Sequence, residues 1–211
     1  MDIAKTEIAA YLSALASSSP APGGGSCAGL SGAMGAALVS MVANLSTGRA
    51  KYADYQELIT ETLNRTGSLI PELTECIHKD MTAFDGVMSA LRMPKDSDEQ
   101  KAERSKALQD AYKTATGAPV ETAEKCLEVM RLAEGLLHRS NATAACDLSV
   151  AGLEARAGIL IALENVNVNL SAIHDSGYAA EMRKWAENID TESQRLLDLI
   201  HKGVAEMSGG K

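Results

Sequence analysis

A single carboxylate stands in an uncharged, mostly apolar stretch of the C-terminal half of the chain. Asp147 is the only charged residue between Arg139 and Glu154, and it lies between Cys146 and Leu148. Burial of a carboxyl group raises its pKa toward neutrality, where the group can both accept and return a proton. Asp147 is therefore a candidate general acid or base. A charge at a helix N-terminus and a buried ion pair are alternatives that the residues alone leave open.

A second feature that could do chemistry is the segment PGGGS, whose three glycines run from Gly23 to Gly25 and precede Ser26. It opens a long apolar run, and no charged residue occurs between Glu7 and Arg49. The first N–H groups of a helix have no partner within the helix, so a helix starting here can accept a carboxylate or another electron-rich group, with Ser26 as a candidate cap. A closely packed helix without a ligand is the alternative.

Neither a membrane span nor a nucleotide-binding loop fits the composition and context of the glycine segment. The run 26–45 has the length of a membrane span, but glycine, alanine, serine and Asn44 dilute it, and no aromatic belt or basic flank accompanies it. A phosphate loop would need a lysine after the glycines, and none follows. The spacing GxGxxA, formed by Gly23, Gly25 and Ala28, comes after an expected helix rather than a strand, so a dinucleotide site is also excluded.

The cysteines and histidines do not form a recognisable metal or nucleophile motif. The four cysteines are far apart and include no CxxC pair. Cys76 and His78 are close in the chain, but two residues apart on a helix they point in different directions. The histidines have no serine or cysteine motif around them. We therefore expect no metal, no nucleophilic triad and no cofactor beyond a substrate.

Composition favours one all-α domain. The chain has 211 residues, of which 45% are hydrophobic and only 3% aromatic, so alanine, leucine and methionine carry the apolar weight. A net charge of −8 argues against a nucleic-acid partner. Acidic residues Asp2 and Glu7 stand where a secretory signal would be positive, and the separated cysteines resemble reduced thiols. These features predict a cytoplasmic protein with no membrane partner.

Helical periodicity and breaking residues predict six or seven helices joined by short loops. We expect one domain over 1–207, built as an up-and-down bundle, with a disordered tail over 208–211. Ser97 and Gln100 form a capping box, Gly67 to Pro71 are expected to kink or break one helix, and Pro119 is expected to interrupt or end another. The alternation in ENVNVNL is assigned to a helix because its flanks are helical. The expected helices cover 8–15, 26–46, 54–91, 97–119, 126–137, 142–173 and 182–204.

Several motifs in order along the chain resemble one known family. They are PAPGGGS, GAMGAALVSMVANL, GRAKY, DMTAF, LRMPK, ERSKALQ, SNATAACDLSVA and NVNVNL, and they span Tyr11 to Ile173. The pattern is similar to the cyclodeaminase domain of formiminotransferase-cyclodeaminase and to the stand-alone methenyltetrahydrofolate cyclohydrolases of the same family. The resemblance implies an all-helical fold that dimerises, with a folate-binding crevice near the subunit interface.

The resemblance also implies roles for individual residues. Asp147 matches the family's catalytic aspartate, and Asp80 in DMTAF is a second candidate whose alternative is a solvated helix face. The cations expected to bind the glutamate carboxylates of folate are Arg49, Lys51, Lys95 and Arg104.

Three further assignments follow from the motifs. Gly23 to Ser26, with Gly24 and Gly25 between them, are expected to form one wall of the crevice. Asn141 either holds the pterin or a reaction water or caps a helix. Asn165 and Asn169 share a helix face but are left out of the site, because Asn165 is 18 residues from Asp147, or about 27 Å along a helix.

The expected activity is hydrolysis of 5,10-methenyltetrahydrofolate to 10-formyltetrahydrofolate. One alternative is a 5-formiminotetrahydrofolate cyclodeaminase, which releases ammonia, and another is a folate-binding helical dimer without catalysis. The partner is expected to be a tetrahydrofolate derivative, with the polyglutamate preference left open.

Overall fold

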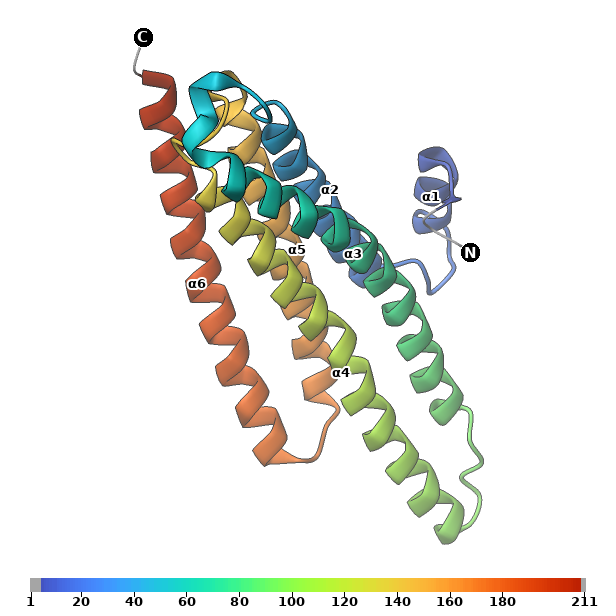
Figure 1. The fold of residues 1–211 in the computed structure, drawn as a ribbon. Helices are drawn as coiled ribbons and strands as arrows, with labels where there is room; N and C mark the ends of the chain where they lie inside the picture. The colour runs from blue at the N-terminus through green and yellow to red at the C-terminus, as the bar shows by residue number, and fades with distance from the viewer. Residues whose placement is uncertain (1–4, 210–211) are drawn as a thin grey trace.

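The structure is a computed structural model that describes residues 5–209, and it contains helices and no strand within that range (Figure 1). The all-α prediction is confirmed. The elements, in chain order, are α1 (Ile8–Leu15), α2 (Gly24–Asn44), η2 (Ala50–Tyr55), α3 (Gln56–Leu91), α4 (Asp98–Gly135), η3 (Ala142–Ala144), α5 (Ala145–Ser171) and α6 (Ser176–Gly209).

Helices α2 to α5 form an up-and-down core bundle, and α6 packs along α5 and α4 (Figure 1). The apolar side chains on the inward face of each helix are fully buried, among them Val39, Ile59, Met130, Leu148 and Ile159. α1 lies apart from the bundle, attached mainly through the buried ring of Tyr11 (Figure 1). One large core therefore joins α2 to α6, and a smaller cluster around Val166, Leu170 and Ile173 packs the end where α5 meets α6.

Glycines let α2 approach its neighbours closely. A methyl group on Gly29 would lie 2.8 Å from the carbonyl oxygen of Leu73 in α3, and one on Gly158 would lie 2.9 Å from the carbonyl oxygen of Ala28. A real side chain does not fit at such distances, so the small residues of α2 and α5 are a packing requirement. α2 is long and apolar enough to cross a membrane by length and composition, but it lies inside the bundle against α3, α4 and α5.

Charged side chains join α3 to α4 alongside this packing. Arg65 donates to Glu128 at 2.5 and 2.6 Å and to Glu72 at 2.7 Å, and Lys125 donates to Glu72 at 2.5 Å. Arg65, followed by Lys125, lowers the pKa of Glu72 to about 2. About a third of the Glu72 side chain is exposed, so solvent screening keeps the contribution of the network to stability small.

The helix break expected near Pro71 and the helix end expected at Pro119 are both absent, because each helix continues through its proline. α3 is unbroken through Pro71, and α4 is unbroken through Pro119, which joins the predicted helices 97–119 and 126–137 into one. A proline inside a helix costs about 3 kcal/mol. Each helix has buried residues on both sides of its proline, and Pro119 is itself buried, so tertiary packing offsets that local cost. The capping box of Ser97 and Gln100 is confirmed.

The C-terminal region also differs from its prediction. α6 begins at Ser176, earlier than expected, and ends at Gly209. Ser208 and Gly209, predicted to belong to a disordered tail, instead form the last turn of α6, because no helix-breaking residue separates them from the turn before. Residues 210–211 of the predicted tail lie outside the described part of the chain. ENVNVNL lies within α5, as predicted.

Candidate active site

A cleft of about 350 Å³ lies where the N-terminus of α2 meets α3, α4 and α5. Its polar wall contains the three glycines, one carboxylate and two carboxamides, namely Gly23, Gly24, Gly25, Asp80, Asn165 and Asn169. Apolar side chains form the rest, including Met81, Phe84, Val87, Met88, Tyr112 and Val168. A flat ring system with a few polar atoms fits such a lining.

Asp80 lies on α3 directly against the start of α2. A side chain on Gly25 would overlap the carboxylate of Asp80, so a glycine is required there for the carboxylate to reach this position. The first N–H groups of α2 have no partner within the helix, and its N-cap residue Gly23 provides no side chain to cap them. The fold thus places the Asp80 carboxylate beside the unpaired backbone N–H groups of the first turn of α2.

The environment of Asp80 suits proton transfer. Burial raises the pKa of the Asp80 carboxyl above its usual range. Within residues 5–209, this carboxylate has no hydrogen bond and no ion pair, and no other carboxylate lines the cleft. The neighbouring Ser26 is fully buried, and its hydroxyl has no partner in the described part of the chain. Unpaired buried polar groups are costly in a fold and are often kept for function.

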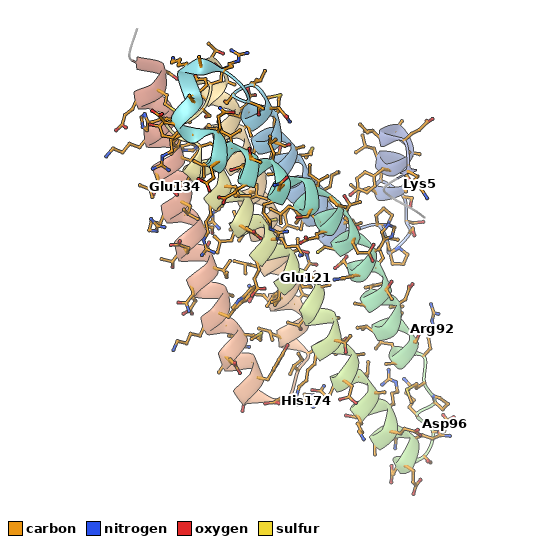
Figure 2. The ribbon with its side chains drawn as sticks, viewed as in Figure 1. Lys5, Arg92, Asp96, Glu121, Glu134 and His174 are labelled. Atoms are coloured by element: carbon orange, nitrogen blue, oxygen red, sulfur yellow. The ribbon has the colours of Figure 1, made fainter. Side chains whose placement is uncertain are left out.

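A second, basic cleft of about 340 Å³ adjoins the first. It is lined by Lys95, Lys101 and Arg104, and Tyr112 lines both clefts. The guanidinium of Arg104 also donates to the carbonyl oxygen of Leu91, a residue of the first cleft, at 3.0 Å. Figure 2 shows this end of the molecule, with Arg92 and Asp96 in the turn between α3 and α4 and His174 in the turn between α5 and α6. The structure therefore brings two predicted cations next to Asp80's cleft.

The other predicted site residues lie at the opposite end of the bundle. Arg49 precedes η2 and is exposed, as is Lys51. Asp147 is half-buried in the first turn of α5, about 27 Å from Asn165 at 1.5 Å per helical residue. Within one chain these residues do not reach the cleft, and their proposed roles stay predictions.

Asn141, at the same end, caps a helix. Its side-chain oxygen accepts hydrogen bonds from the backbone N–H of Thr143 at 3.1 Å and from the Thr143 hydroxyl at 2.9 Å. Its own backbone N–H donates to the Ser46 hydroxyl at 2.8 Å. The capping alternative accounts for this residue.

Sequence reasoning missed Asn165 and Asn169. They were left out because they are far from Asp147 along one helix, and the continuous helix α5 confirms that separation. The cleft, however, forms around Asp80, and α5 brings both amides to it. Their spacing of one helical turn and the repeated asparagines of NVNVNL were the available signals.

A larger groove of about 620 Å³ lies between α3 and α4, but its lining is less suited to proton transfer. It is lined mostly by small residues, and its lysine, Lys79, is already bonded to Glu121 at 2.7 Å (Glu121 is marked in Figure 2). We therefore place the candidate site in the smaller cleft. In the described range, no group of three or more histidine, cysteine, aspartate or glutamate residues is arranged to hold a metal ion.

Comparison with known proteins gives consistent matches. The formiminotransferase-cyclodeaminase family model matches residues 7–188. A methenyltetrahydrofolate cyclohydrolase of Methylorubrum extorquens is 42% identical over 93% of this chain and 95% of its own length. The formimidoyltransferase-cyclodeaminase of Sus scrofa is 29% identical over 90% of this chain, but the match spans only 35% of that longer protein.

The same fold is found in a solved structure. The crystal structure of formiminotetrahydrofolate cyclodeaminase from Thermotoga maritima superimposes with a TM-score of 0.81, at 25% identity, and covers 99% of this chain and 98% of that one.

Proposed function

The chain belongs to the formiminotransferase-cyclodeaminase family, and from this premise we propose that it is an enzyme that hydrolyses 5,10-methenyltetrahydrofolate to 10-formyltetrahydrofolate. The cyclohydrolase of Methylorubrum extorquens supports this direction, since the two chains match over nearly their full lengths at 42% identity. The observation that carries the proposal is the unpaired, desolvated carboxylate of Asp80 in a cleft with apolar walls.

Hydrolysis needs proton transfer at one carbon, and Asp80 is the group that we assign to it. The ionised carboxylate faces the positively charged methenyl group and accepts a proton from water as the water oxygen bonds to the carbon between N5 and N10. Asp80 then passes this proton to N5, and the bond between that carbon and N5 breaks. The remaining hydroxyl proton leaves as the formyl C=O forms on N10. The reaction consumes one water and releases one proton.

The two adjoining clefts suit the two ends of a folate. The apolar side chains of the first cleft, such as Phe84 and Met88, would pack against the pterin ring, and Tyr112 would lie along the middle of the molecule. Lys95, Lys101 and Arg104 would then bind the glutamate carboxylates, because cations that face a cleft pair well with carboxylates. Additional glutamates would extend along this basic cleft.

Cyclodeamination of 5-formiminotetrahydrofolate is the second candidate function. The structural relative from Thermotoga maritima is named for this activity and matches nearly the whole chain. The two reactions share a tetrahedral carbon between N5 and N10, and Asp80 would protonate the departing ammonia instead of N5. The same cleft therefore serves either reaction.

We further propose that the chain forms a homodimer through α2 and α5. These helices pack together, and both expose large apolar side chains outside the core. Met34 and Met41 on α2, Leu45 at its C-cap, and Val150, Leu153 and Leu160 on α5 are 37–49% exposed. Several large exposed apolar side chains on two helices that pack together are typical of a protein interface.

Turnover of each substrate, followed by the near-ultraviolet absorbance of the methenyl compound, tests the proposed function. We expect wild type to consume 5,10-methenyltetrahydrofolate and Asp80→Asn to lose about 10²- to 10⁴-fold in rate, the usual contribution of a general acid or base. Asp85→Asn, an exposed aspartate on the same helix, is the matched control and should keep the wild-type rate. Wild-type protein that binds folate but turns over neither substrate would favour the non-catalytic alternative.

The pH profile and stability of Asp80→Asn separate a chemical role from misfolding. The carboxylate must be ionised to accept a proton, so activity should fall as pH drops through the raised pKa of Asp80, above the range of an exposed aspartate. Burial destabilises the ionised form in the folded chain, so Asp80→Asn should raise the melting temperature at neutral pH. A loss at Asp147→Asn as large as that at Asp80→Asn would contradict our assignment of proton transfer to Asp80.

A further inference from the structure

Helix α5 presents two carboxamides to the cleft that the proposed proton transfer does not use. Asn165 and Asn169 are one turn apart, and Val168 lies between them on the same face. Asn165 sits beside the glycine wall, with its side-chain nitrogen 3.7 Å from the position that a methyl group on Gly24 would take. The amides therefore adjoin the α2 N-terminus on the wall that α5 contributes.

The orientation of the Asn165 amide follows from one hydrogen bond. Its Nδ2 donates to the carbonyl oxygen of Ile161 at 2.9 Å. A carbonyl can only accept, so this bond fixes which end of the amide is nitrogen. Oδ1 is left without a donor among residues 5–209, and the Asn169 side chain has no hydrogen-bond partner at all within that range. An acceptor and a complete carboxamide are thus available to a ligand.

Such unpaired groups are informative because the rest of the cleft is apolar. A half-buried amide without a partner loses hydrogen bonds that water would otherwise supply. Asp80, the Asn169 carboxamide and Oδ1 of Asn165 are all without a partner among residues 5–209, and all three lie in one cleft of about 350 Å³. The lining is complementary to a flat heterocycle that carries donors and acceptors along one edge.

We propose that Asn165 and Asn169 bind the pyrimidinone edge of the pterin and determine specificity for the 2-amino-4-oxo form of the ring. This assignment rests on the proposed function. The carboxamide of Asn169 accepts from N3–H and donates to the 4-oxo group, and Oδ1 of Asn165 accepts from the 2-amino group. Asp80 is then left free to act at the one-carbon unit.

The chemistry of this pairing predicts which analogue the site rejects. In a 4-amino-4-deoxy folate, the 4-oxo acceptor becomes a donor and N3 becomes an acceptor. In the orientation that fits the 4-oxo ring, the Asn169 carboxamide then meets donor against donor and acceptor against acceptor, and it must turn over to match the altered edge. A site that is built for specific hydrogen bonds discriminates strongly against a ligand that leaves them unmade.

Calorimetric binding of two stable probes tests the assignment. The probes are 5-formyltetrahydrofolate and its 4-amino-4-deoxy counterpart, measured against wild type, Asn169→Leu, Asn169→Asp and Asn165→Leu. Asn167→Leu and Asn167→Asp are matched controls, because Asn167 lies on the same helix but is exposed and does not line the cleft. Circular dichroism of every variant checks that the helices have formed.

We expect wild type to bind the 4-oxo probe at least tenfold more tightly than the 4-amino probe. Asn169→Leu and Asn165→Leu should weaken binding of the 4-oxo probe about tenfold or more, and Asn169→Leu should bring the ratio of the two affinities close to one. Asn169→Asp, which keeps the shape of the side chain but offers only acceptors, should also bring the ratio close to one, because each probe presents one donor and one acceptor to the carboxylate. Both Asn167 variants should behave as wild type.

Two results would overturn the assignment, and they have different consequences for the proposed function. If wild type binds the probes and folded Asn169 variants keep the wild-type ratio, the carboxamides do not contact the pyrimidinone edge, while the proposed function stands. If folded wild-type protein binds neither probe, the proposed function fails, and this assignment fails with it. Should Asn169→Leu not fold, the near-isosteric Asn169→Asp decides by itself.

Discussion

At the scale of single residues, the site depends on one missing side chain as much as on the groups that are present. Gly25 leaves room for the Asp80 carboxylate to lie against the first turn of α2. That position partly shields the carboxylate from water and raises its pKa, yet none of the described residues pairs with it. The glycine thus sets the protonation behaviour of a residue that lies 55 positions away in the chain.

Gly25→Ala should lower the turnover of 5,10-methenyltetrahydrofolate at least tenfold, because the new methyl group displaces the Asp80 carboxylate from its position. Gly86→Ala makes the same chemical change on α3 at a site with nothing within 4 Å, and should leave the rate unchanged. Rates are compared with melting curves of both variants. A wild-type rate in a folded Gly25→Ala variant would show that the carboxylate does not need this position.

At the scale of helices, the positions of the cleft residues depend on close crossings of α2 with α3 and α5. Gly29 meets the backbone of Leu73, and Gly158 meets the backbone of Ala28. Backbone atoms cannot turn away as a flexible side chain can, so these crossings tolerate little extra volume. The same crossings bring Asp80 on α3 and Asn165 on α5 to the start of α2.

Gly158→Ala should reduce the free energy of unfolding by about 1–3 kcal/mol, the usual cost of overpacking a well-packed core. The added methyl group would lie 2.9 Å from both the Ala28 carbonyl oxygen and the sulfur of Cys126. Gly117→Ala on α4, with nothing within 4 Å, should instead stabilise the protein by roughly 0.5–1 kcal/mol through helix propensity alone. Urea unfolding measures both. Equal effects of the two substitutions would argue against a close α2–α5 crossing.

At the scale of the whole molecule, the predicted site residues separate into two groups at opposite ends of the bundle. Asp80, the glycines, Lys95 and Arg104 gather at the end where α2 begins and α3 meets α4. Asp147 lies at the other end, where α5 begins. The exposed apolar side chains on which the proposed dimer rests lie at residues 34–45 and 150–160, toward the Asp147 end, so a second copy bound there would cover that part of both helices.

The double variant Leu153→Glu, Leu160→Glu should convert the proposed dimer to a monomer, because buried glutamates without partners oppose association. Both leucines are exposed in the single chain, at 49% and 45%, so its fold should be retained. Leu199→Glu on α6, at 37% exposure, is the matched control and should leave the mass unchanged. Light scattering coupled to gel filtration reports the mass. A monomeric wild type would contradict the dimer.

Much of the helical architecture was predictable because its causes are local. Apolar spacing, the capping box at Ser97, and the scarcity of aromatic and β-branched residues identify helices from neighbours a few positions apart. The prolines show where this approach fails. Pro71 and Pro119 are breakers by local rules, but each helix continues because both of its halves are packed against other helices.

The sequence by itself determined an all-α bundle, a glycine-rich helix start expected to form a wall of the site, and Asp80 as a candidate acid or base. Only the tertiary structure decided that Asp80 stands against Gly25, that Asn165 and Asn169 share its cleft, and that this cleft forms around Asp80 and away from Asp147. The physical reason is that helix formation depends on residues within a turn or two. Which residues meet across helices depends instead on how closely each pair of helices can approach, and therefore on packing across the whole chain.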